Sequence, residues 1–351
     1  MRFAVHFGAS RPRSKRTINQ TKLVREFRYR KMIFMSVTNA TNDITSIVHH
    51  PSRRRSPIAA QIRDRVVRTM LFLSASLSIA ITFTIIFVLF RETFRFFGME
   101  GVSVGNFLGS AKWSPLFSGE IGIWPLVAGT MLVTAVAMIV ALPLGLVTAV
   151  YLSEYAPRKL RSTLKPTLEI LAGIPTVVYG YFALTVITPG LKFFHEGFNV
   201  FNAFSAGLAV GILCLPTVCS LSEDALHAVP RSLRDAAYGL GGTRFDVATK
   251  VVVPAALSGL VSAFLLAIAR AIGETMIVAL AAGATARMTM DPRNEIQTMT
   301  GWMVQMALGD ASHEGMEYYS MYAVAAVLFV MTFSLTVLGN IVRMRFREAY
   351  E

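Results

Sequence analysis

Long apolar stretches without charged residues follow one another along most of the chain. Each runs for about 18 residues or more, close to the length that a helix needs to cross a bilayer while satisfying its own backbone hydrogen bonds. The pattern therefore predicts an all-α integral membrane protein with six transmembrane helices. The stretches are residues 69–90, 121–153, 170–191, 197–222, 251–269 and 318–342, the fifth continuing past two charged residues to about 282 and the helix of the fourth beginning near Phe204.

The composition agrees with this fold class and excludes others. Hydrophobic residues make up 54% of the chain and charged residues only 16%, whereas soluble domains carry about 25% charge. The two cysteines, Cys214 and Cys219, lie in one apolar run without a Cys/His cluster, so we expect neither a disulfide framework nor a metal site. All six histidines lie outside the deep spans, which disfavours an intramembrane metalloprotease.

The net charge of +13 reflects membrane topology. Of the 34 Lys and Arg residues, 27 lie in the two termini and in the segments 154–169 and 223–250. Because short cytoplasmic segments are rich in Lys and Arg, this distribution places both termini and the 223–250 loop in the cytoplasm.

The same distribution suggests a division of the chain into four parts. Residues 1–60 form a basic tail that we expect to be disordered, 61–120 the first transmembrane helix with an outer segment, 121–343 a five-helix core that contains the 223–254 loop, and 344–351 a cytoplasmic tail. Three alternatives remain for the basic tail. It attracts anionic lipid, it is an Arg/Ser-rich transit peptide, or it is dispensable, with Met32 or Met35 as the true start.

The loop between the fourth and fifth stretches predicts two short helices. Pro230 suits a first helical position, Gly241 and Gly242 suit a helix stop, and Thr243 with Asp246 resembles a capping box. The first helix has a small apolar face, which suits shallow docking either on the protein's own helix ends or on a partner. That face consists of Leu233, Ala236, Ala237 and Leu240.

The spacing of this loop resembles the EAA motif of ABC importer permeases. Asp235-Ala236-Ala237, then Gly241, then Val251-Val252-Val253-Pro254 matches the motif, with Asp235, Val251 and Val253 as conservative departures. The resemblance implies a MetI-like permease core whose loop is a coupling helix seated in a groove of a separate ATPase. It also makes Asp235, Ala236, Ala237, Gly241 and Pro254 the coupling residues. Gly241 should adopt a positive φ, because the chain turns there from one helix into the next.

Two charges interrupt the fifth stretch. Arg270 lies 16 residues after Pro254, or about 24 Å along a helix, and a buried Arg is costly unless it faces protein or water. Glu274 is one helical turn further on, so the two form either a structural ion pair or part of an anion pathway, in which a guanidinium holds an oxyanion bidentately. A carboxylate beside the Arg would accept a proton from hydrogen phosphate, whereas sulfate has none to donate.

The residues around these charges resemble the permease subunits of the phosphate-specific ABC transporter. Residues 269–280, Ala-Arg-Ala-Ile-Gly-Glu-Thr-Met-Ile-Val-Ala-Leu, are more similar to its PstC branch than to its PstA branch, and residues 172–180, Ala-Gly-Ile-Pro-Thr-Val-Val-Tyr-Gly, are a second match. The resemblance covers the chain from about residue 60 onward, and implies that Arg270, Glu274 and Thr275 belong to the phosphate pathway.

The same resemblance implies the partners and the location. They are a PstA-like second permease, a PstB-like ATPase dimer and a PstS-like periplasmic phosphate-binding protein in a bacterial inner membrane, with no cofactor on this chain. The chain has no Walker sequence, so ATP hydrolysis belongs to the partner subunit. The alternatives are a permease for sulfate or molybdate, and a membrane scaffold that senses phosphate without conducting it.

Two further features carry structural expectations. Gly173 and Pro175 predict a kink in the third span, either for packing or as part of the pathway wall, and Pro143 predicts a weaker one in the second. Near the chain's last span, residues 297–308 are expected to form a short re-entrant or interfacial helix anchored by Trp302.

Overall fold

The computed structural model describes residues 57–115, 118–309 and 315–345. The chain divides into two compact units, Met1–Ala80 and Ile81–Glu351. Helix α2, Pro57–Phe97, begins in the first unit and ends in the second. Positions 1–56 of the predicted basic tail, and 346–351 of the predicted C-terminal tail, lie outside the described residues.

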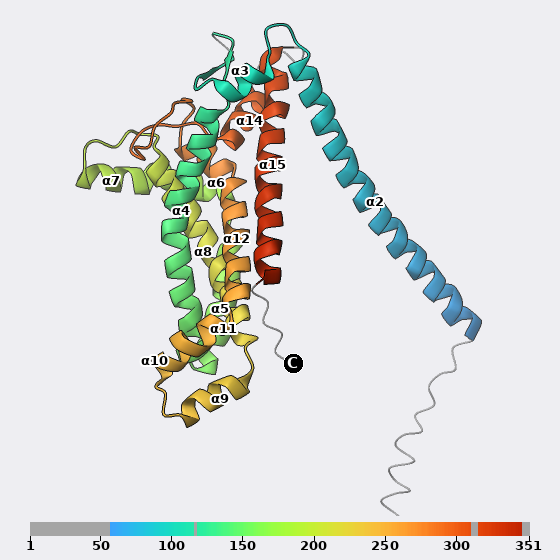
Figure 1. Ribbon diagram of the computed structural model, residues 1–351, viewed down its shortest axis with the longest axis vertical. Coiled ribbons are helices and arrows are strands. Elements are labelled where there is room, and N and C mark those ends of the chain that lie inside the picture. Colours follow the sequence, from blue (N-terminus) through green and yellow to red (C-terminus); the bar gives the residue numbers. More distant parts are fainter. Residues whose placement is uncertain (1–56, 116–117, 310–314, 346–351) are drawn as a thin grey trace, which may run out of the picture. The chain divides into compact units, whose positions relative to one another are not determined.

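The second unit is built from helices, apart from one pair of two-residue strands (Figure 1). Three short π-helical turns, labelled η, interrupt the α-helices. After α2 the elements are α3 Val104–Gly109, β1 Trp113–Ser114, β2 Glu120–Ile121, α4 Trp124–Val150, η1 Tyr151–Tyr155, α5 Arg158–Ala172, α6 Thr176–Phe182, η2 Ala183–Ile187, α7 Thr188–Phe194, α8 Ala203–His227, α9 Arg231–Gly239, α10 Arg244–Val247, η3 Ala248–Val252, α11 Val253–Ala255, α12 Leu257–Ile272, α13 Met276–Ala281, α14 Met299–Leu308 and α15 Met316–Arg345.

The all-α membrane fold is confirmed. Five helices among the described residues are long and apolar enough to cross a membrane, and a sixth span results if the bent pair Arg244–Ala255 and Leu257–Ile272 is counted as one. The two helices of that pair meet at an angle of 71°. The fourth span begins where the sequence predicted, at Ala203, because the Asn202 side chain caps the helix by accepting a hydrogen bond from the Ser205 amide.

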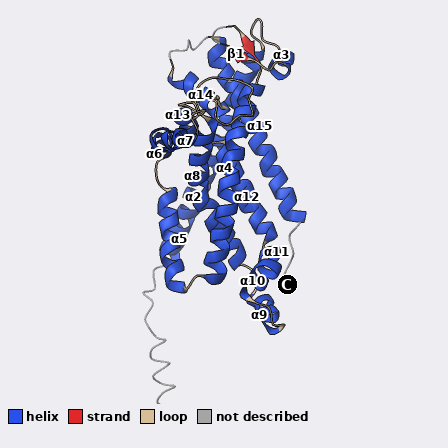
Figure 2. Ribbon diagram, turned by 90° about the vertical axis from the view of Figure 1, so that its left-hand side faces the viewer, coloured by secondary structure: helices blue, strands red, loops and turns tan. Residues whose placement is uncertain are grey.

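The third span differs from the prediction of one kinked helix. Helix α5 ends at Ala172 with Gly173 as its cap, and α6 begins only at Thr176 with Pro175 as its cap. Proline lacks the N–H that would continue the helix, and it disfavours helical geometry in the residue before it. The span is therefore divided into two separate helices here. In Figure 1 α7 runs sideways from α4, and in Figure 2, turned by 90°, α6 and α7 are seen nearly end on.

Glycines allow α4 and α8 to pack closely along the centre of the unit. A Cβ atom on Gly145 would lie 2.6 Å from Val218 Cγ1, and one on Gly207 would lie 2.6 Å from Val136 Cβ. Small residues at such contacts let two helix backbones approach, which is the usual basis of helix association in a membrane. The main apolar core forms on this contact and extends to α12 and α13.

The end of the unit that contains α3 and α14 has a second, aromatic core. The short helix predicted near Trp302 is present as α14, but Trp302 is buried, at 3% exposed, rather than an interfacial anchor. Its ring stacks edge-on against Trp113 at 5.2 Å, and its Nε1 donates to Ser320 Oγ at 3.1 Å. The tertiary structure therefore uses this tryptophan to join α14 to β1 and α15.

Candidate functional site

The fifth span ends between its two charges. Helix α12 stops at Ile272, Gly273 caps it, and the next helix, α13, begins at Met276. Glu274 therefore does not lie one helical turn beyond Arg270, and no ion pair within 4.0 Å joins the two in the described part of the chain. The ion-pair hypothesis is wrong for this conformation, because Gly273 has a low helix propensity and interrupts the helix on which it depended.

Arg270 instead contacts the neighbouring helix α8. Its Nη1 donates a hydrogen bond to Thr217 Oγ1 at 2.9 Å, and both side chains are half-buried. A guanidinium has five N–H donors and remains charged in proteins. Because this is its sole side-chain hydrogen bond in the described structure, the cation keeps unused donors at the α8–α12 contact.

Glu274 lies at the break between α12 and α13. It is 9% exposed, and its Oε1 accepts a long hydrogen bond of 3.4 Å from the amide of Ile277 in the first turn of α13. Its backbone carbonyl accepts from Thr300 Oγ1 of α14 at 2.7 Å. Thr275 bonds locally, through Oγ1 to the Gly273 carbonyl at 3.1 Å. The unwound segment is thus tied to α13 and α14 and keeps a buried carboxyl group.

The other helix break lies next to this one. The Tyr179 hydroxyl donates to the Leu171 carbonyl at 2.9 Å, which bridges the gap at Gly173 and Pro175. On the same helix, a Cβ atom on Gly180 would lie 3.2 Å from Ile277 Cα of α13. Tyr179 also lies within the electrostatic reach of Arg270. The two interrupted spans therefore meet beside the arginine, which the sequence did not predict.

The predicted coupling loop is present at the opposite end of the unit, where α9 lies below α10 and α11 in Figure 1 and packs against η3 and α10. Gly241 has a φ of +84°, which confirms the turn argument. The capping box between Thr243 and Asp246 is also formed, in both directions. Pro230 is the residue before the helix rather than its first residue, because α9 begins at Arg231.

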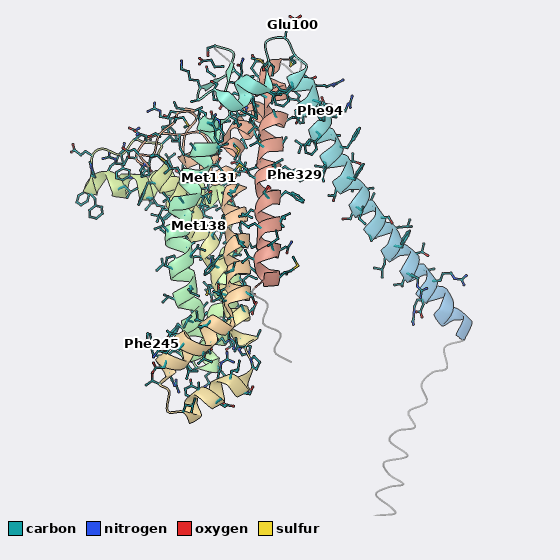
Figure 3. All side chains as sticks on the ribbon, viewed as in Figure 1. Phe94, Glu100, Met131, Met138, Phe245 and Phe329 are labelled. Atoms are coloured by element: carbon teal, nitrogen blue, oxygen red, sulfur yellow. The ribbon has the colours of Figure 1, made fainter. Side chains whose placement is uncertain are left out.

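The apolar face of α9 is divided between two environments. Leu233 and Ala237 pack against the unit's own third apolar core. In contrast, Asp235 and Ala236 are exposed, and Leu240 is 92% exposed. Phe245, labelled in Figure 3, is exposed at the start of α10. One side of the loop thus packs on the protein itself, and the other side is exposed.

Arg234 fastens α9 to the rest of the unit. Its Nη2 donates to the Leu226 carbonyl near the end of α8 at 2.8 Å and to Glu154 Oε1 of η1 at 3.1 Å. The Arg234 side chain is 14% exposed and that of Glu154 8%. No role was predicted for Arg234 from the sequence. The signal for its role is its place in the segment that follows the end of α8, since an arginine near a helix C-terminus can satisfy the last carbonyls.

A second charged cluster joins α5 to α8. Glu223, 1% exposed, pairs with Arg161 and with Lys165, whose Nζ lies 2.9 Å from Oε2. The hydrogen bond from Lys165 to Asp224 is the main cause that raises the pKa of the lysine. The adjacent carboxylates Glu223 and Asp224 at the end of an apolar span were the sequence signal for this cluster, which the prediction missed.

Pro254 lies at the bend of the fifth span. It occupies the start of the short helix α11, next to η3 and just before α12. Because proline donates no backbone hydrogen bond, it suits a helix start that follows an irregular turn. The residue therefore belongs to the joint between the coupling loop and the span that carries Arg270.

Comparison with known proteins supplies the family context. Residues 141–348 match the family model described as binding-protein-dependent transport system inner membrane component. The probable ABC transporter permease protein YqgH of Bacillus subtilis is 32% identical over 80% of this chain and 90% of its own length. The phosphate transport system permease protein PstC of Mesorhizobium japonicum is 31% identical over 68% of this chain and 78% of its own length.

The fold has relatives among solved structures as well. A chain of a bacterial ABC transporter involved in the import of the acidic polysaccharide alginate superposes with a TM-score of 0.58 over 82% of this chain and 97% of that one. Sequence identity is 12%. At that identity the likeness concerns the fold alone.

Proposed function

Since the chain belongs to the family of inner membrane components of binding-protein-dependent transport systems, we propose that it forms the anion pathway of an ATP-driven importer of inorganic phosphate. As in other members of the family, it is a transport permease subunit, and ATP hydrolysis takes place on a separate ATPase. The proposal concerns the substrate, the residues that contact it and the way in which the ATPase drives them.

The proposal rests on the surroundings of Arg270, a half-buried cation whose one side-chain hydrogen bond in the described structure goes to a neutral hydroxyl. Arg270 lies in the last turn of α12, at the break within the fifth span, and an arginine at the centre of a membrane span costs about 2.5 to 3.5 kcal/mol to insert. Among the described residues no carboxylate lies within 4.0 Å of this guanidinium to offset the cost, and its one side-chain hydrogen bond goes to the neutral Thr217 hydroxyl. A half-buried cation with free donors between two helices is suited to an anion that passes, and a guanidinium binds phosphate oxygens through charge-assisted hydrogen bonds.

Phosphate is favoured over other oxyanions by two arguments. Relatives from several organisms are named as phosphate transport system permease proteins. In addition, the buried carboxyl group of Glu274 lies at the break that follows Arg270. Hydrogen phosphate can donate a proton to an ionised carboxylate, whereas sulfate at neutral pH cannot, and buried groups left unpaired are a strong basis for rejecting a near-isostere.

The coupling path begins at the exposed side of α9. We assign Asp235, Ala236, Ala237 and Gly241 to contact or turn roles on the ATPase, with Pro254 at the joint to the fifth span. Arg234 then transmits movement of α9 to α8 and η1 through its bonds to Leu226 and Glu154. Helix α8 carries Thr217, the partner of Arg270, so a displaced α9 acts on the pathway through one continuous helix.

The complete transporter requires further subunits. We propose a second permease similar to PstA, an ATPase dimer similar to PstB and a periplasmic phosphate-binding protein similar to PstS. We propose that both termini and the 223–250 loop face the cytoplasm, which the excess of Lys and Arg in these segments supports. Arg270 and the breaks at Gly173 to Pro175 and Gly273 to Thr275 then lie between the periplasmic and cytoplasmic ends of the core, where a pathway must pass.

Uptake of radiolabelled phosphate tests the proposal. Cells whose sole copy of this subunit is wild type, Arg270→Gln or Arg287→Gln would be compared with and without excess sulfate, and the membrane content of each variant measured by immunoblot. Arg287 is exposed on the outer loop and serves as the matched control. We expect uptake that sulfate does not compete, lost in Arg270→Gln and retained in Arg287→Gln.

Two results would contradict this expectation. Normal uptake by Arg270→Gln would remove the arginine from the pathway while leaving the family assignment intact. Competition by sulfate, or phosphate-dependent signalling without uptake, would instead point to a different oxyanion or to a sensing scaffold.

A further inference from the structure

The hydroxyl of Thr217 is bonded differently from those of most other threonines in the helices. Ten other helical threonines donate a hydrogen bond to the carbonyl four residues earlier in their own helix, as hydroxyls in helices commonly do. Thr217 has one hydrogen bond among the described residues, the one it accepts from Arg270. The ten are Thr93, Thr130, Thr134, Thr148, Thr163, Thr167, Thr185, Thr249, Thr332 and Thr336.

The hydroxyl hydrogen of Thr217 is therefore available to donate a hydrogen bond. A hydroxyl carries one O–H donor and two acceptor lone pairs. Its oxygen is engaged by the Nη1 of Arg270 at 2.9 Å, but the O–H proton is given to no protein acceptor in the described structure. The neighbouring guanidinium retains N–H donors of its own. Two side chains from two helices thus offer donors at one place, and no carboxylate of the residues that the structure describes lies within 4.0 Å of the arginine to occupy them.

The position of Thr217 in α8 adds to the argument. Pro216 directly precedes it inside the helix, and a proline lacks the N–H that would bond the carbonyl of Ile212. Helix α8 remains continuous there but lacks this one backbone hydrogen bond beside the arginine, whereas the neighbouring spans are interrupted at Pro175 and at Gly273. The tripeptide Pro-Thr-Val occurs at 175–177 and again at 216–218. The first copy opens α6, and the second lies inside the continuous helix α8, where its threonine bonds to Arg270.

We propose that Thr217 is an anion-binding residue that acts together with Arg270, holding one tetrahedral oxyanion between α8 and α12. This inference rests on the proposed function and names a contact of the same pathway. The guanidinium supplies charge, and the hydroxyl supplies a directional hydrogen bond without a second charge. Such a pair suits transport, because a site on a pathway must bind strongly enough to admit the anion and weakly enough to release it.

The test compares variants of the reconstituted transporter, with its partner subunits and the phosphate-binding protein present. Thr217→Val keeps the shape of the side chain and removes the hydroxyl, whereas Thr217→Ser keeps the hydroxyl. Thr332→Val is the matched control, since Thr332 is also half-buried in a long apolar helix but bonds back to Leu328. The measurements are phosphate import into proteoliposomes, ATP hydrolysis in the same samples and the amount of assembled complex.

We expect Thr217→Val to lower the number of phosphate ions imported per ATP hydrolysed by about tenfold, in line with the loss of a hydrogen bond to a charged group. In Thr217→Ser and Thr332→Val the import per ATP should remain within about twofold of wild type. A twofold change corresponds to less than half of the free energy of one such hydrogen bond. Assembly should be unchanged in all three. A merely structural threonine would change the amount of complex but not the ratio of import to hydrolysis.

Three outcomes would overturn the inference: normal import per ATP in Thr217→Val, equal loss in the valine and serine variants, or a loss fully explained by reduced assembly. Arg270→Gln, measured in parallel, separates this inference from the proposed function. If Arg270→Gln fails and Thr217→Val transports normally, Thr217 alone is excluded. If Arg270→Gln also transports normally, the pathway proposal fails with it.

Discussion

Arg234 and Glu154 form a nearly buried ion pair between the coupling loop and the end of the first core helix. Their Nη2 and Oε1 atoms are 3.1 Å apart, and the same nitrogen also donates to the carbonyl of Leu226. The two charged residues are 80 positions apart in the sequence. The pair and the bond to Leu226 connect α9 to η1 and to α8, the helix that carries Thr217.

Removing one partner of this pair should uncouple the transporter. In Arg234→Gln the carboxylate of Glu154 stays buried without its cation, which costs about 3 kcal/mol when a buried pair is broken in this way. We expect ATP hydrolysis to persist while phosphate import falls at least several-fold. Proteoliposomes with matched protein content would show it as a decreased ratio of import to hydrolysis.

Arg231 provides the control for that experiment. It begins the same helix but is exposed, and exposed charges contribute little to stability. Arg231→Gln should keep the wild-type ratio. Equal defects in both variants would mean that the positive charge of the loop matters rather than the bond to Glu154.

The turn after α9 gives a second prediction. Gly241 has a φ of +84°, and a Cβ atom there would meet nothing within 4 Å. Substitution is therefore opposed by backbone conformation alone, at about 1 to 2 kcal/mol for a non-glycine residue in the left-handed region. Gly241→Val should shift the loop and reduce transport more than ATP hydrolysis.

Gly239 allows a direct comparison, because it also has open space around its Cα but no positive φ. Gly239→Val should transport nearly as well as wild type. Uptake by Gly241→Val at the wild-type rate, in membranes with equal protein content, would count against the role of this turn in coupling.

The close contact between α4 and α8 gives a third prediction. A methyl group on Gly207 would lie 2.6 Å from Val136 Cβ and 3.0 Å from the Val133 carbonyl. Gly207→Ala should destabilise the purified protein by about 1 to 3 kcal/mol through overpacking. The measurement is the thermal unfolding midpoint in detergent. Gly190→Ala, in α7 with nothing within 4 Å, should not lower it.

The stability of the protein should depend on pH through the pair of Asp291 and Arg293 in the segment between α13 and α14. Hydrogen bonds from Arg293, at 2.7 Å to Oδ2 and 2.9 Å to Oδ1, hold the pKa of Asp291 at about 2, below its usual 3.8. A lowered folded-state pKa contributes stability at any pH above the unfolded value, and this contribution is lost as the pH falls through the folded value. The window is therefore about pH 4 to 2.

Asp291→Asn isolates this effect. The difference in unfolding midpoint between wild type and variant should be constant from neutral pH down to about pH 4 and should shrink towards zero near pH 2. Arg293→Gln should show the same loss. A difference that stays constant to pH 2 would show that the carboxylate is not stabilised by Arg293 in the folded protein.

Local sequence was sufficient for a large part of this molecule. Apolar length predicted the membrane helices, because a helix in lipid must satisfy its own backbone. The positive φ of Gly241 and the capping box at Thr243 followed from residue types within a few positions of one another. These features depend on interactions between near neighbours, which the order of residues specifies directly.

The arrangement of the candidate site was decided by the tertiary structure. The sequence placed Glu274 beside Arg270 on one helix, but the helix ends at Ile272 with Gly273 as its cap. Arg270 instead bonds to Thr217, which is 53 residues away in the sequence. Likewise, nothing near Arg234 or Glu223 in the sequence identified Glu154 or Lys165 as their partners. A charged side chain in a helix bundle pairs with a residue of whichever helix packs against it. Which helix that is depends on the tertiary packing of α4, α5, α8 and α12.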